Sequence, residues 1–460
     1  MGKDGQKRFH ILTFGCQMNA GDSAWLAGAL RELGYVESAR AEADIHILNT
    51  CSVRDKPENK VYTELGQIRL LAEAHPEREI LACVGGCVAQ QLGSGLFARS
   101  RELRLLFGAD GLASAPGAID FLVKNPGQKI GLLDFSPEFI ERPPKAEPGA
   151  TKASVFVNIM QGCDNFCAYC IVPQVRGRQK SRKSGAVLEE CRRFLDCGAR
   201  EITLLGQNVN SFGLDSQGDG TGFSALLRRT AALPGLLRLR FMTSHPKDLD
   251  SGLIRAFAEI PQLAPHLHLP LQSGSDRILR SMGRGYTLKS YLNLVEKLRA
   301  ARPGLQISTD LIVGFPGEEE EDFEATLEAM WEADFCASFS FVYSDRPGTR
   351  AKDLPGKIPR RAALERLARL QERQNLNSGR ILRSLRGTSA QVLIEGKETK
   401  PSSAAPEAGE EGETWYGREA GGFHVLVSAP LSRCLAPGDL AEVIITGSGK
   451  HTLKGRIADK

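Results

Sequence analysis

Residues 154–170, SVFVNIMQGCDNFCAYC, join an apolar run to a loop that carries three cysteines. The run Ser154–Met160 predicts a buried strand, and the loop behind it holds Cys163, Cys167 and Cys170 within eight residues. A [4Fe–4S] cluster normally takes four thiolates, so three without an obvious fourth leave one iron open for chemistry. The alternatives are a zinc site or buried core thiols, but zinc loops usually pair two short cysteine spacings and no second pair is present. The spacing therefore predicts a catalytic iron–sulfur cluster on this cysteine loop, residues 163–170.

Five further apolar runs follow the first, and most of them precede a helical stretch. They are residues 201–205, 237–242, 265–271, 306–313 and 337–343. Each run ends in polar or glycine-rich residues, as at Gly206-Gln207-Asn208. Repeated strand–helix units with polar groups at the strand ends indicate a barrel whose site lies at that end. We predict a partial (β/α)6 barrel over residues 153–377, which leaves lateral room for a large substrate.

The N-terminal segment, residues 1–135, predicts an α/β domain with a parallel sheet. Its short apolar runs, residues 10–14, 44–49 and 80–84, alternate with helical patterns at 23–33 and 58–73. Cys16, Cys51 and Cys87 each stand at the end of a strand, and such ends can converge on one point. This N-terminal cysteine set is therefore either a second three-ligand cluster site or a group of structural thiols. Cys83 lies inside an apolar run, where a packed core thiol is the better interpretation.

The rest of the chain predicts a linker and a third, smaller domain. Residues 136–152 hold four prolines and no periodic pattern, which is typical of a linker. Residues 380–460 contain short strand-like runs without a long helix, which predicts a small antiparallel β-barrel. Residues 398–414 have the composition of a flexible loop. The fold class expected for the whole chain is α/β.

Composition limits the classes of protein that fit. The 460 residues carry a net charge of +4, with 42% hydrophobic and 25% charged residues, as in an ordinary globular protein. Eleven cysteines scattered over a long chain do not resemble a secreted disulfide framework. No apolar run approaches the ~20 residues of a membrane span. We expect a cytoplasmic monomer with reduced thiols and no membrane partner.

The spacing Cys-x-x-x-Cys-x-aromatic-Cys at 163–170 resembles the radical S-adenosylmethionine superfamily. The resemblance implies that the open iron binds S-adenosylmethionine, and that an electron from the cluster splits it to give a 5′-deoxyadenosyl radical. It also implies a cofactor-binding turn after the second strand, where Gly206, Gln207 and Asn208 stand. Residues 310–318, including Gly314, resemble the adenine-binding motif of the family. For Gly206 and Gly314, an ordinary turn glycine is the alternative.

Three strings around the N-terminal cysteine set resemble the first domain of the methylthiotransferases. They are Thr13-Phe14-Gly15-Cys16-Gln17-Met18-Asn19, Asn49-Thr50-Cys51-Ser52-Val53-Arg54 and Gly86-Cys87-Val88-Ala89-Gln90. The resemblance implies that Cys16, Cys51 and Cys87 hold a second [4Fe–4S] cluster, which carries or supplies sulfur. The C-terminal segment resembles the TRAM domain, an RNA-binding barrel, so the likeness covers essentially the whole chain.

Two strings also favour one branch of that family. Cys16-Gln17-Met18-Asn19 and Leu205–Ser211 resemble the enzymes that act on N6-(dimethylallyl)adenosine in tRNA. We expect formation of the 2-methylthio derivative at position 37, beside the anticodon. The expected partners are the tRNA anticodon stem-loop, an external electron donor and a sulfur source. The alternatives are a methylthiotransferase for threonylcarbamoyl adenosine or a ribosomal protein, and a non-catalytic RNA-binding iron–sulfur protein.

Two basic runs predict a path for RNA phosphates. Residues 176–183 contain five basic side chains in eight, directly beyond the cysteine loop. Residues 357–386 contain nine, among them Arg366, Arg369 and Arg373. A solvated helix face is the alternative for the second run.

Overall fold

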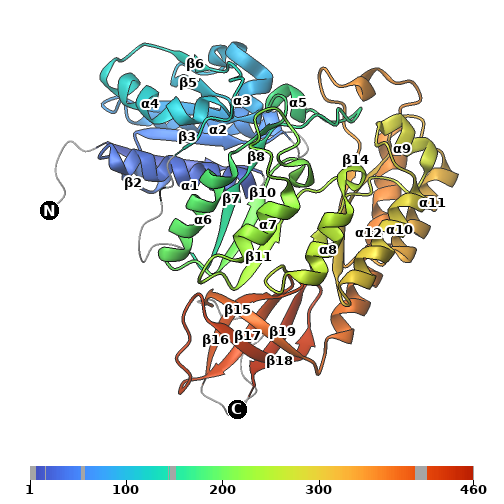
Figure 1. Cartoon of the computed structure of the whole chain (residues 1–460). Helices are drawn as coiled ribbons and strands as arrows, with labels where there is room; N and C mark the ends of the chain where they lie inside the picture. The colour runs from blue at the N-terminus through green and yellow to red at the C-terminus, as the bar shows by residue number, and fades with distance from the viewer. Residues whose placement is uncertain are drawn as a thin grey trace.

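The computed structural model describes residues 7–15, 17–52, 57–142, 145, 152–398 and 412–458. Figure 1 shows three bodies along the chain: a blue N-terminal sheet with its helices, a green-to-orange partial barrel, and a red C-terminal barrel. The N-terminal body lies against the early strands of the partial barrel, and the C-terminal body covers its opposite end. Among these residues, no helix has the length and apolarity needed to cross a membrane.

The N-terminal body is a six-stranded parallel sheet in the order β2-β1-β3-β4-β5-β6. Its strands are β1 (Arg8–Thr13), β2 (Val36–Glu37), β3 (Ile45–Thr50), β4 (Leu81–Gly86), β5 (Leu103–Phe107) and β6 (Ile130–Leu132). Its helices are α1 (Gln17–Glu32), α2 (Pro57–Ala74), α3 (Cys87–Leu92) and α4 (Ala115–Lys124). Strands β3, β4 and β5 are buried along their whole length because helices cover both faces of the sheet. The predicted parallel α/β domain is confirmed.

The central body contains the six predicted strands, each at its expected place. They form two parallel sheets, β11-β10-β7 and β12-β13-β14, which meet where Leu239 bridges Leu263. The strands are β7 (Ser154–Asn158), β10 (Glu201–Leu205), β11 (Arg238–Phe241), β12 (His266–His268), β13 (Gln306–Val313) and β14 (Ala337–Val342). One large hydrophobic core lies between their outer face and the surrounding helices. The predicted partial barrel is confirmed.

The helices of the barrel alternate with its strands. They are α6 (Ser184–Asp196), α7 (Phe223–Ala231), α8 (Ser251–Glu259), α9 (Asp276–Met282), α10 (Leu288–Ala301), α11 (Glu320–Glu332) and α12 (Arg360–Ser384). A short hairpin of β8 (Met160–Gln161) and β9 (Lys180–Ser181), with α5 (Val172–Val175) inside it, frames the cysteine loop. Helix α12 runs through residues 377–380, where the sequence analysis ended the barrel domain.

The C-terminal body is a closed five-stranded barrel in the order β15-β16-β17-β19-β18. Its strands are β15 (Ser389–Lys397), β16 (Gly412–Glu419), β17 (His424–Pro430), β18 (Leu440–Ser448) and β19 (Thr452–Ile457). The expected barrel is confirmed, but the expectation of a wholly antiparallel one is wrong, because β17 and β19 pair in parallel. Strand β16 also begins inside the predicted loop 398–414, of which residues 399–411 lie outside the described part of the chain.

A buried charge network fastens this barrel to the central body. Arg240 pairs with Glu201 at 2.8 Å, and Arg238 lies 3.5 Å from the same carboxylate. Arg238 donates to the carbonyl of Arg418 at 2.9 Å, and Arg240 donates to that of Glu419 at 3.0 Å. Both guanidinium groups therefore satisfy backbone carbonyls of the neighbouring domain while Glu201 balances their charge.

Candidate active site

The cysteine loop lies at the carboxyl end of β7, inside the hairpin of β8 and β9. The backbone N–H of Cys170 donates to the carbonyl of Cys167 at 3.0 Å, and Phe166, directly before Cys167, adopts a φ of +45°. Burial raises the pKa of Cys163, and it raises the pKa of Cys170 to about 12. Cys167 adds to both shifts because its charge lies close to each thiol. The structure thus gathers the three predicted thiols in one partly buried loop.

The spacing of the cysteine loop is the observation that favours a cluster over the zinc alternative, because zinc loops usually pair two short cysteine spacings. Within the described ranges, no three His, Cys, Asp or Glu side chains are arranged to hold a single metal ion. A [4Fe–4S] cluster takes each thiolate at a separate iron, so each of the three thiols in this loop could bind one iron.

The turn after β10 holds the cysteine loop in place. The Gln207 side-chain oxygen accepts the N–H of Gly162 at 2.6 Å, directly before Cys163. The Asn208 amide donates to Asp248 at 2.7 Å, and Asp248 accepts from Asn165 of the loop at 3.2 Å. Of the predicted cofactor residues, Gln207 and Asn208 therefore reach the cysteine loop, the first directly and the second through Asp248.

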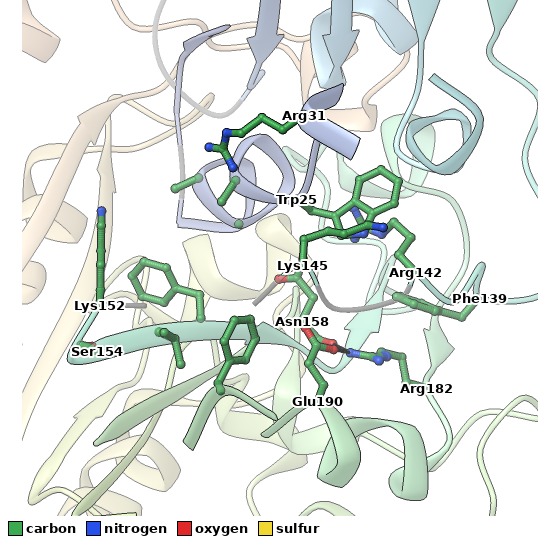
Figure 2. A pocket seen from close by; sticks show the side chains of 16 residues that line it. Trp25, Arg31, Phe139, Arg142, Lys145, Lys152, Ser154, Asn158, Arg182 and Glu190 are labelled. Carbon is green, nitrogen blue, oxygen red and sulfur yellow. Dashed lines mark hydrogen bonds and ion pairs between the residues drawn. The ribbon is translucent and has the colours of Figure 1, made fainter. Parts of the chain in front are cut away.

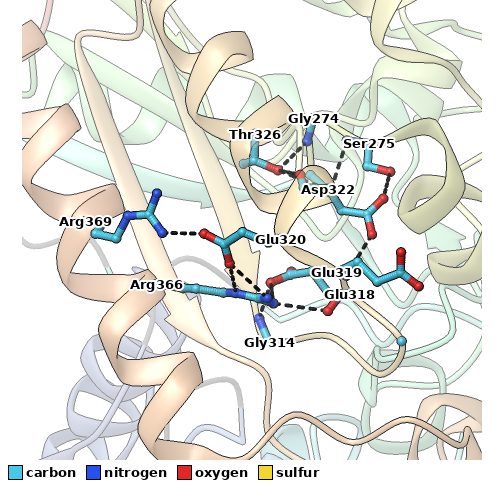
Figure 3. A network of polar contacts seen from close by, with 12 residues as sticks. Gly274, Ser275, Gly314, Glu318, Glu319, Glu320, Asp322, Thr326, Arg366 and Arg369 are labelled. Carbon is cyan, nitrogen blue, oxygen red and sulfur yellow. Dashed lines mark hydrogen bonds and ion pairs between the residues drawn. The ribbon is translucent and has the colours of Figure 1, made fainter.

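The two predicted glycines have packing reasons for their identity. A Cβ on Gly206 would lie 2.5 Å from the Met160 side chain. Gly314 has a φ of +70°, and a Cβ there would lie 2.7 Å from Ala363 of α12. Its N–H donates to Glu318 at 3.0 Å (Figure 3). Both glycines thus allow close approaches of the chain, which supports the turn-glycine alternative.

The second basic run does not form a free phosphate path at Arg366. Figure 3 shows Arg366 between Glu318 and Glu320, and Arg366 meets the Glu318 carboxylate at 2.6 Å. The Arg366 side chain is only 12% exposed. Arg369 pairs with Glu320 at 2.5 Å and with Glu324. These arginines fasten α12 to α11. Arg366 is largely covered and cannot contribute to a phosphate path, whereas RNA binding by the half-exposed Arg369 stays a prediction.

The N-terminal cysteine set lies at the carboxyl edge of its sheet. Cys51 follows β3 and Cys87 begins α3 directly after β4, and both are 4% exposed. Cys16 lies outside the described residues, but Gly15 before it has a φ of +114°, and a Cβ there would lie 2.1 Å from Cys51. Strands β1, β3 and β4 are neighbours in the sheet, so Gly15, Cys51 and Cys87 lie at adjacent strand ends.

Buried amides and hydroxyls hold these loops together. Asn19 of α1 donates to the side chain of Asn49 at 2.9 Å and to the carbonyl of Thr50 at 3.0 Å. The Thr50 hydroxyl donates to the carbonyl of Gly85 and accepts the N–H of Val88 at 3.2 Å. The strings that marked the set in the sequence therefore encode the scaffold around the cysteines. Cys83 is a fully buried core thiol, as predicted.

The two cysteine regions adjoin across the domain interface. Cys87 packs against Ile171, which follows Cys170 directly, and against Val175 at the end of α5. Asp110, beyond β5, accepts from Lys180 at 2.7 Å and from Gln161 at 2.9 Å. Both partners belong to the hairpin that carries the cysteine loop. The loop at the carboxyl edge of the N-terminal sheet thus contacts the hairpin of β8 and β9, which carries the cysteine loop.

The first basic run supplies that interface and is mostly unavailable to RNA. Lys180 is buried against Asp110, and Arg182 is buried between Glu141 and Glu190. Arg176 is buried with its guanidinium 3.9 Å from Asp22 of α1. Of the three, none has a surface-exposed side chain, so the predicted phosphate path is wrong for them. Arg178 is 73% exposed and pairs with Asp164.

A cavity of about 450 Å³ lies between α1, the linker and β7. Figure 2 shows Trp25, Phe139 and Arg142 on one side and Asn158, Arg182 and Glu190 on the other. Arg142 pairs with Asp22, Arg182 pairs with Glu190, and none of the cysteines that the structure describes lines the cavity. This cavity belongs to the seam between the domains.

Comparison with known proteins agrees with both halves of the site. The model of the Radical SAM superfamily matches residues 157–330, and that of the uncharacterized protein family UPF0004 matches residues 8–108. A tRNA-2-methylthio-N(6)-dimethylallyladenosine synthase of Oleidesulfovibrio alaskensis is 55% identical over 98% of this chain and 99% of its own. One of Nitratidesulfovibrio vulgaris is 56% identical over 97% of each chain, and one of Geobacter sulfurreducens is 44% identical over 98% and 97%. The chain belongs to this synthase family.

Solved structures of two radical enzymes share the fold of this chain. A radical S-adenosylmethionine methyltransferase, TsrM, of Kitasatospora setae matches with a TM-score of 0.53 at 15% identity, over 75% of this chain and 77% of its own. The cobalamin-dependent S-adenosylmethionine radical enzyme OxsB matches with a TM-score of 0.51 at 11% identity, over 82% and 56%. Membership of the radical SAM superfamily implies a [4Fe–4S] cluster and S-adenosylmethionine.

Among the residues that the structure describes, four buried polar atoms without a hydrogen-bond partner lie at the carboxyl ends of the barrel strands. They belong to Asn208, Ser244, His245 and Gln272, which follow β10, β11 and β12. Thr243 and Gln272 also adopt φ angles of +71° and +76°, in a region that side chains rarely occupy. Buried unsatisfied groups and backbone strain are typical of ligand sites. An amide, a hydroxyl and an imidazole suit the amino-acid and ribose groups of S-adenosylmethionine, so the residues present fit that cofactor.

Sequence reasoning did not identify Ser244, His245 or Gln272. A pattern of strand ends marks the loops but does not tell which polar atoms stay unpaired after folding. Burial lowers the pKa of His245 to about 2, so its imidazole is neutral at physiological pH. Its Nδ1 accepts the N–H of Lys247 at 3.2 Å, so the Nε2 of the neutral ring carries the hydrogen and can donate a hydrogen bond without bringing charge into the site.

Proposed function

We propose that this chain converts N6-(dimethylallyl)adenosine at position 37 of tRNA, beside the anticodon, into 2-methylthio-N6-(dimethylallyl)adenosine. The observation that carries the proposal is the meeting of the two cysteine regions, in which Cys87 packs against Ile171 and Val175, in and beside the short helix α5 that follows the cysteine loop. Relatives of the same length, named for this product, supply the choice of nucleoside. Replacing an adenine C2–H with sulfur needs more than general acid–base catalysis, because that hydrogen is neither acidic nor activated.

Cys163, Cys167 and Cys170 would hold the cluster that cleaves S-adenosylmethionine. When bound, this cluster supplies the electron that yields a 5′-deoxyadenosyl radical, which removes an unactivated hydrogen. Gln207 holds the loop that bears these cysteines, through the N–H of Gly162. We assign Asn208, Ser244, His245 and Gln272 to polar contacts with S-adenosylmethionine, since their free polar atoms lie at this end of the barrel.

Cys16, Cys51 and Cys87 would hold a second [4Fe–4S] cluster that carries the sulfur. The supporting geometry is the common carboxyl edge of β1, β3 and β4, where Gly15 lies in close contact with Cys51. The clamp between Asp110 and Lys180 keeps this edge against the cysteine loop. Sulfur carried here would be delivered across the domain interface without leaving the protein, which favours a short and water-poor transfer path.

The reaction also needs a binding surface for tRNA and two external donors. The C-terminal barrel would bind the tRNA, and Glu201 with its two arginines keeps that barrel fixed beneath the active site. An external one-electron donor and an external sulfur source are required. We propose a cytoplasmic monomer.

Nucleoside mass spectrometry tests the proposed function. Total tRNA is digested from cells that have this protein and from cells that lack it. We expect the 2-methylthio nucleoside to disappear without the protein and N6-(dimethylallyl)adenosine to accumulate in equal amount. Loss of a methylthiolated threonylcarbamoyl adenosine, with the dimethylallyl nucleoside unchanged, would overturn the choice of substrate.

A further inference from the structure

A buried cation lies against one of the three cysteines of the loop. Arg284, between α9 and α10, is 5% exposed and directs its Nη1 to the Cys167 sulfur at 3.3 Å. The distance is that of a charge-assisted hydrogen bond to sulfur. Arg284 comes from a segment far from the cysteine loop along the chain, so its approach to Cys167 is a product of the fold.

Every other partner of this guanidinium is neutral. Its Nη2 donates to the carbonyl of Pro270 at 3.2 Å, and its Nε donates to the Tyr286 hydroxyl at 2.9 Å. The Tyr286 ring lies 5.3 Å from its central carbon. Across the described ranges, Arg284 forms no ion pair with a carboxylate, whereas the buried Arg182, Arg240 and Arg366 each do.

A buried charge is costly unless an opposite charge balances it. The nearest group that can become negative is the thiolate of Cys167, together with whatever that thiolate binds. We propose that Arg284 is the counter-ion of the cluster on the cysteine loop and raises its reduction potential. The inference rests on the proposed function for the presence of that cluster.

The physical basis is the charge that reduction adds. One electron passes from an external one-electron donor to the cluster, which gains one negative charge, and no bond forms or breaks. Arg284 remains protonated throughout, because a guanidinium does not lose its proton in proteins. A fixed, buried positive charge and a hydrogen bond to the ligand sulfur both favour the reduced form more than the oxidised one. Arg284 is therefore a positioning residue that acts through Cys167.

The test is an anaerobic redox titration of the full-length holoenzyme, followed by electron paramagnetic resonance. The signal that changes when S-adenosylmethionine is added identifies the cluster on the cysteine loop. Arg284→Gln should lower its midpoint potential by at least the 59 mV that corresponds to a tenfold change in a one-electron equilibrium constant. Arg284→Lys, which keeps the charge, should recover most of this shift. Arg178→Gln is the matched control, since it removes an exposed cation beside the same loop and should leave the potential unchanged.

An unchanged potential in Arg284→Gln, at normal iron content, would overturn the inference. If this variant does not take up iron, thermal melting of the iron-free chains decides the matter. Removing an uncompensated buried charge should raise the melting temperature of the iron-free Arg284→Gln chain above that of the iron-free wild type, and a lower melting temperature would contradict the proposal. Absence of any signal that responds to S-adenosylmethionine in the wild type would instead count against the proposed function.

Discussion

The two cysteine regions are built in opposite ways. The cysteine loop takes its three thiols from one segment, residues 163–170, whereas the N-terminal set takes them from the ends of three neighbouring strands. The first can be recognised from spacing alone. The second, which is a proposed site, would depend on the neighbouring positions of β1, β3 and β4 and on Gly15 and Gly86, where the chain approaches Cys51 and Thr50 closely. A local motif tolerates change elsewhere, while a site assembled from distant segments depends on the whole sheet.

The largest expected effect follows removal of a thiol from the cysteine loop. Cys163→Ala, Cys167→Ala or Cys170→Ala should each abolish cleavage of S-adenosylmethionine, since each removes an iron ligand. The assay is 5′-deoxyadenosine release under reducing, anaerobic conditions. Normal release in any one of these variants would contradict the assignment of the loop.

Removal of a thiol from the N-terminal set should separate the two regions. Cys16→Ala, Cys51→Ala and Cys87→Ala should each lower the iron content by about one cluster and stop sulfur insertion, while some 5′-deoxyadenosine still forms. Cys83→Ala is the matched control, because this thiol lies in the core of the same sheet. Iron loss in Cys83→Ala together with full loading in Cys87→Ala would show that the ligand assignment is wrong.

The clamp between the regions should affect their cooperation more than their separate chemistry. The double variant Asp110→Asn, Lys180→Met removes both buried charges and loosens the domain interface. We expect about a tenfold loss or more of methylthiolated product per 5′-deoxyadenosine formed, since displacements of about 1 Å can cost 10²-fold in rate. Lys124→Met, which breaks an exposed pair with Asp120 in the same domain, is the control. An unchanged product ratio in the double variant would dissociate the clamp from sulfur transfer.

Substitution of Glu201, which lies far from both cysteine regions, should lower the stability of the whole protein and not the chemistry of one region. Burial alone would raise the pKa of Glu201, but Arg240 and Arg238 hold it below its usual range. The ionised carboxylate therefore contributes stability above pH ~4.3, the ordinary glutamate pKa, and this contribution is lost as the pH falls through the lowered value. Glu201→Gln should lower the free energy of unfolding at pH 7 by about 3–5 kcal/mol, because two buried arginines lose their counter-charge. Chemical denaturation across pH checks this, and a difference from wild type that grows toward acid pH would contradict it.

The parts of the molecule that follow from periodicity were predictable. Apolar runs located β1, β3 and β4 of the N-terminal sheet and all six strands of the barrel, whereas β2, β5 and β6 were not predicted. The spacing of three cysteines located the cysteine loop. Strand β19 has no continuous apolar run, because Lys454 and Arg456 alternate with the buried Leu453 and Ile457, so it is harder to recognise in the sequence than its neighbours. Its parallel pairing with β17 is set by barrel closure, which no local pattern encodes.

Charge was the least predictable feature, because a sequence shows charges but not their partners. Lys180 appeared to belong to a basic run for RNA, yet its carboxylate partner Asp110 stands 70 residues earlier. Arg366 similarly meets Glu318 of a distant loop. Arg284 belongs to neither basic run, and nothing in the sequence around it indicates that it contacts Cys167. A basic cluster therefore indicates RNA binding only after intramolecular ion pairs have been counted.

Competition among three substrates in one reaction tests the central claim most directly. Reconstituted full-length enzyme, with S-adenosylmethionine, a reductant and a sulfide source, would receive tRNA bearing dimethylallyladenosine, tRNA bearing threonylcarbamoyl adenosine, and unmodified tRNA. Mass spectrometry of the digested nucleosides should find a methylthio group on dimethylallyladenosine alone, with the other two at background. Methylthiolation of threonylcarbamoyl adenosine with the dimethylallyl nucleoside untouched would contradict the proposed substrate, and 5′-deoxyadenosine without any thiolated nucleoside would contradict the transfer of sulfur between the two cysteine regions.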